Sequence, residues 1–128
     1  MKWRTAGVYV AIALFVMLSF GIGVNAETVN WSNPTMYTDN TTIPPAKQAQ
    51  LSTELQYRIG ASFSPFGTAT GGASVFTAPY VTTPGGTSYW RARSISVADN
   101  NSTSAWSQEY TFVRPFQVPA QGQVLGVQ

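Results

Sequence analysis

The stretch TSYWRARSISVADNNSTSAWSQEYTF, residues 87–112, decides the fold. It predicts two strands joined by the polar loop 99–104, with Trp90 near the start of the first strand and Trp106 at the start of the second. Because side chains of a strand alternate between its faces, one face of the first strand should hold Trp90, Ala92 and Ser94, and the other Tyr89, Arg91, Arg93 and Ile95. The second strand, 106–113, should place Tyr110 and Phe112 on the face of Trp106.

Shorter strands are expected elsewhere in the chain, at 27–32, 53–60, 73–77 and 80–82. Segment 53–60 alternates most regularly, with Leu55, Tyr57 and Ile59 expected inside. The stretch 61–72 is rich in Ser, Gly and Thr and is expected to be a loop, and Thr83–Gly86 is expected to form a tight turn. The polar connection 35–52 needs a tether, for which Ile43 is the best candidate. No segment after residue 26 has helical periodicity, so short strands and frequent turns predict an all-β sandwich.

Residues 1–26 have the pattern of an export signal. Lys2 and Arg4 precede the apolar run Val8–Phe20, and the small residues Val24 and Ala26 predict cleavage before Glu27. The alternative is an uncleaved anchor helix, because the apolar segment 6–24 approaches the roughly 20 residues that span a bilayer. The expected organisation is therefore a signal peptide or anchor at 1–26, a domain at 27–114 and a tail at 115–128. The domain would be secreted, periplasmic or extracellular, or held outside the cytoplasm by an inner-membrane anchor.

Composition excludes several kinds of chemistry. The net charge is +2, with seven bases and five acids, and Lys2 and Arg4 in the leader leave five bases against five acids. A neutral domain gives no reason to expect nucleic acid binding, and membrane contact is expected only through residues 1–26 if they are retained.

The chain has no cysteine and no histidine, so the usual nucleophile–histidine and cysteine or histidine metal sites are impossible. Asp39 and Asp99 lie in turn-like loops and should cap turns; the alternative is that they bind calcium weakly. We expect no enzyme activity, no catalytic residues, no cofactor and no metal site.

Four segments in order, VNWSNPTMYTDNTTIPP (29–45), LQYRIG (55–60), TPGGTSYWRARS (83–94) and SAWSQEYTF (104–112), resemble a fibronectin type III domain of the bacterial and phage kind. The resemblance covers residues 29–113. It implies an immunoglobulin-like, two-sheet antiparallel sandwich, here preceded by an N-terminal hydrophobic signal or anchor helix. It also implies that Trp106 closes the edge of the core, whose members would be Trp31, Leu55, Tyr57, Ile59, Trp90, Ala92 and Phe112.

The chain departs from this family's pattern in two places. The family's buried tyrosine corner would fall on Ser88, with Tyr89 beside it, so the corner is lost or the register shifts by one. A chain cut before Glu27 also has no residues for the family's first strand, which leaves a sheet edge uncovered. The tail Phe116–Gln128 or a strand from another protein would fill that edge; alternatively, the tail is disordered.

Two sets of side chains are candidates for ligand binding. Tyr89, Arg91 and Arg93 form an outward stripe, which is either a binding strip or a solvated face. Phe63, Phe66 and Tyr80 lie in polar segments and would either stack on sugar rings or cover the ends of the core. We therefore expect an exported, non-catalytic module for adhesion or protein interaction at the cell envelope or outside the cell. The alternative is a small carbohydrate-binding accessory protein, encoded by a phage or its host; the partner in either case is an unknown protein or glycan at the cell surface.

Overall fold

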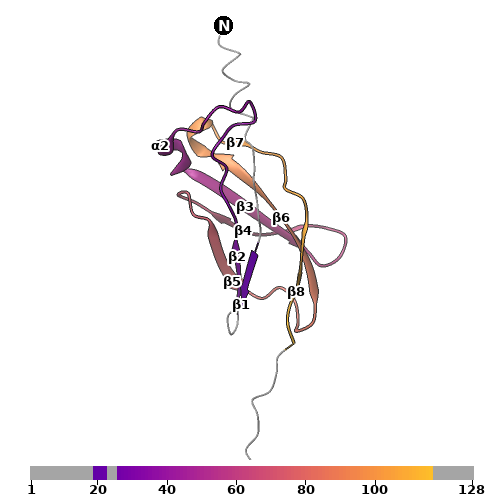
Figure 1. Cartoon of the computed structure of the whole chain (residues 1–128). Helices are drawn as coiled ribbons and strands as arrows, with labels where there is room; N and C mark the ends of the chain where they lie inside the picture. The colour runs from indigo at the N-terminus through magenta and orange to yellow at the C-terminus, as the bar shows by residue number, and fades with distance from the viewer. Residues whose placement is uncertain (1–18, 23–25, 117–128) are drawn as a thin grey trace, which may run out of the picture.

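The computed structural model describes residues 19–22 and 26–116, which form two antiparallel β-sheets packed face to face (Figure 1). The smaller sheet has the order β1-β2-β5, from β1 (Ser19–Ile22), β2 (Ala26–Asn30) and β5 (Val75–Pro79). The larger sheet has the order β4-β3-β6, and β7 and β8 both pair with β6; its strands are β3 (Leu51–Arg58), β4 (Ser64–Ala69), β6 (Thr87–Ser96), β7 (Ser102–Thr103) and β8 (Tyr110–Val113). The predicted all-β, two-sheet sandwich is confirmed.

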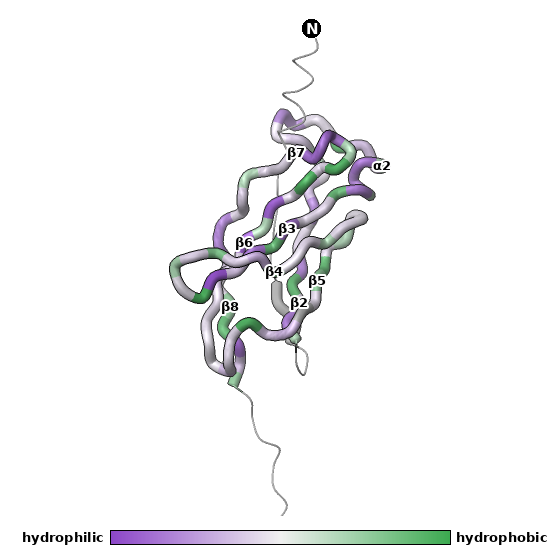
Figure 2. Tube along the Cα trace, turned by 180° about the vertical axis from the view of Figure 1, so that it is seen from behind, coloured by the Kyte–Doolittle hydropathy of each residue, from purple (hydrophilic) through white to green (hydrophobic). Residues whose placement is uncertain are grey.

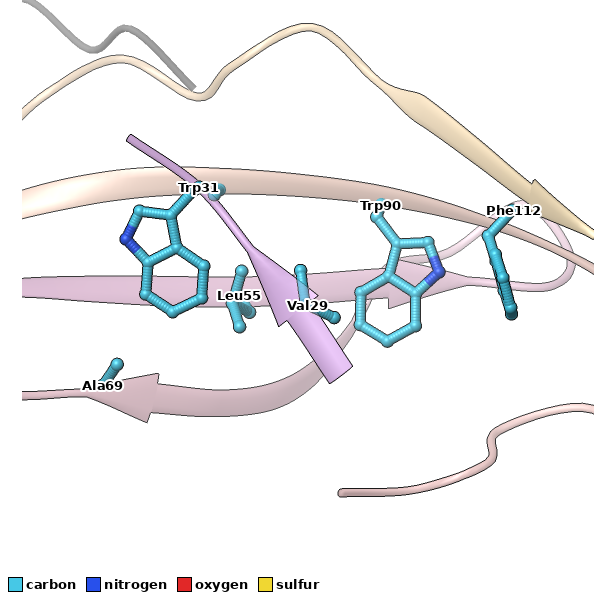
Figure 3. Packing of buried hydrophobic residues seen from close by; sticks show 7 residues of the cluster. Val29, Trp31, Leu55, Ala69, Trp90 and Phe112 are labelled. Carbon is cyan, nitrogen blue, oxygen red and sulfur yellow. The ribbon is translucent and has the colours of Figure 1, made fainter. Parts of the chain in front are cut away.

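Strand β6 forms the centre of the larger sheet, and its side chains alternate without a break between buried and half-buried positions. Trp90 is completely buried, and Figure 3 shows it in a row of apolar side chains between the sheets. Burying a large aromatic side chain removes its area from water and drives the two sheets together. The buried cluster consists of Val29, Trp31, Leu55, Ala69, Trp90, Ala92 and Phe112.

Two residues expected in the core or at its edge lie elsewhere. Ile59 is 54% exposed, because β3 ends at Arg58 and the alternation ends with it. Trp106 is half-buried on the outer face of the larger sheet and is not in the core cluster. The predicted strand 106–113 is shorter than expected, since β8 begins only at Tyr110.

Some local structure was not predicted. Strand β4 lies in the stretch 61–72 that was expected to be a loop, and it places Phe66 against the core. A four-residue helix, α2 (Pro45–Gln48), interrupts the long polar connection, and a single 3₁₀ turn, η1 (Val97–Asp99), follows β6. Residues 80–82, expected as a strand, are not in one. Ile43 is completely buried against Tyr37 in a second small cluster, as expected of a tether.

Of the two alternatives for the family's tyrosine corner, the structure favours its loss, without a shift of register. Ser88 is completely buried and its hydroxyl accepts a hydrogen bond of 2.8 Å from Trp90 Nε1, while Tyr89 lies on the outer face. The turn at Thr83–Gly86 is confirmed: Gly86 N donates to Thr83 O at 2.9 Å, and Gly85 has a φ of 81°, which favours glycine.

Strand β1 comes from residues assigned to the leader. It pairs antiparallel with β2 and fills the sheet edge that a cut before Glu27 would leave open. Residues 1–18 and 23–25 of the predicted hydrophobic helix lie outside the described part of the chain, whereas residues 19–22 form a strand. In residues 19–22 and 26–116 no helix is long and apolar enough to cross a membrane.

Candidate functional site

The outward-facing rows of β3 and β6 lie side by side on the larger sheet. The antiparallel register places Glu54 opposite Arg93, Gln56 opposite Arg91 and Arg58 opposite Tyr89. Residues directly opposite each other in a sheet are close enough for their side chains to interact. The register therefore joins the predicted Tyr89–Arg91–Arg93 stripe to a second row that the alternation of β3 had already turned outward.

Arginines and aromatic rings alternate across this face. The Arg93 guanidinium lies 4.4 Å from the centre of the Trp106 ring. Arg91 lies between two rings, 4.3 Å from Trp106 and 3.8 Å from Phe63. Arg58 lies 4.2 Å from Tyr89 and 5.7 Å from Phe63. We call this set the arginine–aromatic ladder; its members are Arg58, Arg91, Arg93, Phe63, Tyr89 and Trp106.

The three arginines of the ladder differ in their charge partners. Arg58 pairs with Glu109 at 2.6 Å and Arg93 with Glu54 at 2.8 Å. Arg91 instead donates from Nε and Nη2 to the neutral Oε1 of Gln56, at 2.9 and 2.7 Å. Three arginines against two glutamates leave one positive charge, and among the described residues it is Arg91 that has no carboxylate within salt-bridge distance.

A local irregularity turns Trp106 toward the ladder. Ser104 N donates to Ser94 O, and Ser107 N donates to Ala92 O, so three positions of one segment span two positions of β6. The hydroxyls of Ser104 and Ser107 accept bonds of 2.9 and 3.0 Å from the N–H groups of Ser94 and Ala92. Serine hydroxyls therefore replace the backbone carbonyls of a regular ladder. The extra residue moves Trp106 from the inner face to the outer one.

A projecting loop lies next to the ladder. The connection from β3 to β4 extends away from the sandwich in both views of the trace (Figures 1 and 2). Arg58 Nη1 donates to Gly60 O at 3.1 Å and so fixes the start of the loop. Ile59 is 54% exposed there, and Phe63 at the other end belongs to the ladder. An exposed aliphatic side chain therefore lies beside stacked arginines.

Two of the six predicted binding residues lie apart from this face. Phe66 packs inward with its ring centre 4.6 Å from that of Trp90. Tyr80 packs against the core and is covered by Arg114, whose guanidinium lies 3.8 Å from its ring centre. The structure thus brings Phe63, Tyr89, Arg91 and Arg93 together and leaves Phe66 and Tyr80 outside.

Sequence reasoning missed the other half of the face. Placing Leu55, Tyr57 and Ile59 inside turns the alternate residues Glu54, Gln56 and Arg58 outward, but alternation alone does not say which residues of another strand they meet. Trp106 was assigned inward because a regular strand was assumed. The Ser-x-x-Ser spacing of Ser104 and Ser107 was the available signal for the irregularity.

The two turn aspartates have structural partners. Asp39 accepts bonds from the backbone N and the hydroxyl of Thr41, at 3.0 and 2.6 Å, and these bonds hold its pKa below the usual value. Asp99 is buried, and its carboxylate accepts bonds from Tyr37, Ser96 and Lys47. Its burial alone would raise its pKa, but these bonds and the Lys47 charge outweigh burial and lower it. No group of three or more metal-binding side chains occurs in the described part of the chain.

Glu27 is a second buried carboxylate, at the start of β2. Burial raises its pKa, and the positive charge of Arg114, just after β8, acts in the opposite direction. The two sheets therefore bring the end of β8 close to the beginning of β2.

The fold matches known structures, although the sequence matches no family model and no curated protein. The sixth fibronectin type III domain of human fibronectin type III domain containing protein 3 has a TM-score of 0.60 and 18% identity, over 87% of this chain and 93% of that one. A fibronectin type III domain from the human KIAA0970 protein has a TM-score of 0.64 and 12% identity, over 99% and 91%. The chain therefore has a fibronectin type III-like, immunoglobulin-like fold.

Receptor chains share this fold over part of their length. The chicken interferon gamma receptor alpha chain aligns with a TM-score of 0.55 and 16% identity, over 79% of this chain and 50% of the receptor chain. At these identities the likeness shows the fold alone.

Proposed function

We propose that the protein is an exported, non-catalytic interaction module that binds a protein partner through the arginine–aromatic ladder and the adjoining 59–63 loop. The observation that carries the proposal is the position of Arg91. Its guanidinium is stacked between Phe63 and Trp106 and bonded to the neutral amide of Gln56. Within the part of the chain that the structure describes, the two glutamates of this face pair with Arg58 and Arg93, so the charge of Arg91 is left without a carboxylate in salt-bridge distance.

The chemistry of the face suggests the chemistry of its partner. A stacked, immobilised guanidinium binds a carboxylate with little additional loss of side-chain entropy. Arginine and aromatic residues are the types that most often dominate protein interfaces. The exposed side chain of Ile59 would add apolar contact area beside the charge. We therefore expect a partner segment that presents an acidic residue next to an apolar one.

Receptor chains of the same fold support an interaction role for this chain. The signal-like sequence of residues 1–26 supports export, and export would place the protein at the cell envelope or outside the cell. A partner on a cell surface would make the module an adhesion protein.

The experiment is affinity capture from envelope extract of the producing organism, with the exported protein immobilised. The Arg91→Gln variant removes the charge, and Arg91→Lys keeps the charge but loses the planar stacked group. We expect capture to fall about tenfold or more in both variants, which corresponds to losing roughly 1.4 kcal/mol or more of binding energy. Val75→Ser, on the exposed edge of β5, is the control for general adhesion. Equal capture by wild type and Arg91→Gln would contradict the proposal.

The carbohydrate-binding alternative has less structural support. Of the three aromatic residues considered for sugar stacking, Phe66 packs in the core and Tyr80 lies under Arg114. Phe63 faces outward, but Arg91 covers its ring. A glycan array probed with the exported protein should therefore give no binding that depends on Phe63; binding lost in Phe63→Ala but kept in Arg91→Gln would favour this alternative.

A further inference from the structure

Export and strand β1 require the same residues. Cleavage before Glu27 removes β1 (Ser19–Ile22) completely. If the leader instead remains as an anchor, β1 leaves only residues 6–18 of the apolar segment to span the membrane. A helix of that length covers about 20 Å at 1.5 Å per residue, against a hydrocarbon core of about 30 Å. In either exported form, therefore, β1 cannot pair with β2.

An uncovered β2 would expose an unpaired sheet edge. On its other side β2 pairs with β5, and a cut before Glu27 removes Ala26 but keeps this pairing from Glu27 to Asn30. On the free side lie the backbone groups that β1 otherwise satisfies, with Phe20 opposite Val29, Gly21 opposite Thr28 and Ile22 opposite Glu27. Unpaired N–H and C=O groups on an edge strand are a template for another strand. A replacement should repeat the order apolar, glycine, apolar.

The C-terminal tail contains that order. Leu125-Gly126-Val127 repeats the pattern of Phe20-Gly21-Ile22, and residues 115–128 include no charged side chain. In the register of β1, Leu125 would lie opposite Val29, and Gly126 opposite Thr28. Absence of charge matters because a charged side chain beside the buried Val29 would lose its hydration.

The direction of the chain favours a tail from another molecule. The end of β8 lies near the beginning of β2, where Arg114 acts on Glu27, and β1 also ends there, because Ile22 is opposite Glu27. Figure 1 shows β8 ending toward the same end of the sandwich as β1. An antiparallel strand on β2 must run toward this end. The molecule's own tail would have to run along β2 and reverse within residues 117–124, whereas a tail from a second copy enters at the far end without reversing.

We propose that in the exported protein the free edge of β2 accepts residues Leu125–Val127 of a second copy in place of β1. Each molecule then donates its tail to one neighbour and accepts the tail of another on its smaller sheet. Such a head-to-tail contact can form an open chain of molecules and need not close into a ring. The proposal rests on export, which is part of the proposed function, but the contact lies on the opposite sheet from the arginine–aromatic ladder, so it is independent of the proposed binding face.

The absence of cysteine makes a cross-linking test specific. The full chain carrying Thr28→Cys and Gly126→Cys is exported through its own leader, and intact-mass spectrometry identifies its N-terminus. Directly opposite residues in a sheet are within the distance that a disulfide bridges. We expect a series of disulfide-linked multimers under oxidising, non-reducing conditions. There are two controls. Thr28→Cys alone allows at most a disulfide-linked dimer. Thr28→Cys with Gln121→Cys moves the partner cysteine five residues out of register.

Light scattering on the exported protein provides a second measurement. Wild type should have a mean mass at least twice that of the Leu125→Lys variant, because that lysine would lie opposite the buried Val29, and Gln121→Lys should behave like wild type. Each of three results would overturn the proposal. Wild type could be monomeric, the disulfide could form within one molecule, or the matched cysteine pair could give no more multimers than the controls. A retained β1, seen as an N-terminus at or before Ser19 without cross-links, would also overturn it. Arg91→Gln should leave the cross-links unchanged.

Discussion

The two faces of strand β6 are built from the same backbone and differ in how their side chains are stabilised. On the inner face, Trp90 and Ala92 are completely buried and stabilise the fold by removal of apolar area from water. On the outer face, Arg91 and Arg93 are half-buried and are held by stacking and by polar partners. Substitutions on the inner face are therefore expected to unfold the protein, whereas substitutions on the outer face should leave it folded. That difference makes the outer face the better place for a binding site.

The largest expected effect comes from the inner face. Trp90→Ala removes the central ring of the core and its contacts with Phe66 and Tyr57. The loss should be about 3–5 kcal/mol, against a total of roughly 5–15 kcal/mol for a domain of this kind. Thermal and urea melts should show little folded protein. A melting curve equal to wild type would mean that Trp90 does not hold the sheets together.

The Asp99 cluster should have the next largest effect, because it joins the loop before β3 to the end of β6. Asp99→Asn weakens the bonds from Tyr37, Ser96 and Lys47 and should cost roughly 2 kcal/mol in urea melts at neutral pH. Since folding lowers the Asp99 pKa, the contribution is complete above the ordinary aspartate value. It is lost as the pH falls through the lower value of the folded state.

The control for this prediction is Asp39→Asn, at an exposed turn, which should change stability much less. The difference in stability between wild type and Asp99→Asn should shrink as the pH is lowered below the ordinary aspartate value. A difference that stays constant with pH would show that the Asp99 charge is not what stabilises the cluster.

The inner face of β6 could be predicted from the sequence because strict alternation and one large aromatic residue specify it. The outer face could be predicted only in part. Its arginines were identified, but their partners depend on strand register, which no local pattern contains. Strand β4 was missed because its Ser, Pro and Gly content favours turns, and pairing with β3 overrides that preference. Ile59 was placed inside because alternation does not show where a strand ends.

Trp106→Ala tests the outer face directly. It removes the ring on which Arg91 and Arg93 stack, at about 0.5–1 kcal/mol for each exposed cation–π contact, so the total loss should be about 1–2 kcal/mol. The protein should remain folded, with a lower melting temperature, and should lose capture of a partner more than it loses stability. Unfolding as complete as that of Trp90→Ala would remove the distinction between the two faces.

The smallest effect is expected for the ion pair between Glu54 and Arg93. Both side chains remain partly exposed, at 23% and 32%, so water and salt screen their attraction. Glu54→Gln should therefore cost less than about 1 kcal/mol in urea melts, and the cost should fall further as salt is added.

The same substitution leaves Arg93, like Arg91, without a carboxylate partner. If an acidic partner binds this face, Glu54→Gln should strengthen capture while it weakens the fold slightly. Parallel losses of stability and binding would instead mean that the ion pair positions the ladder for its partner.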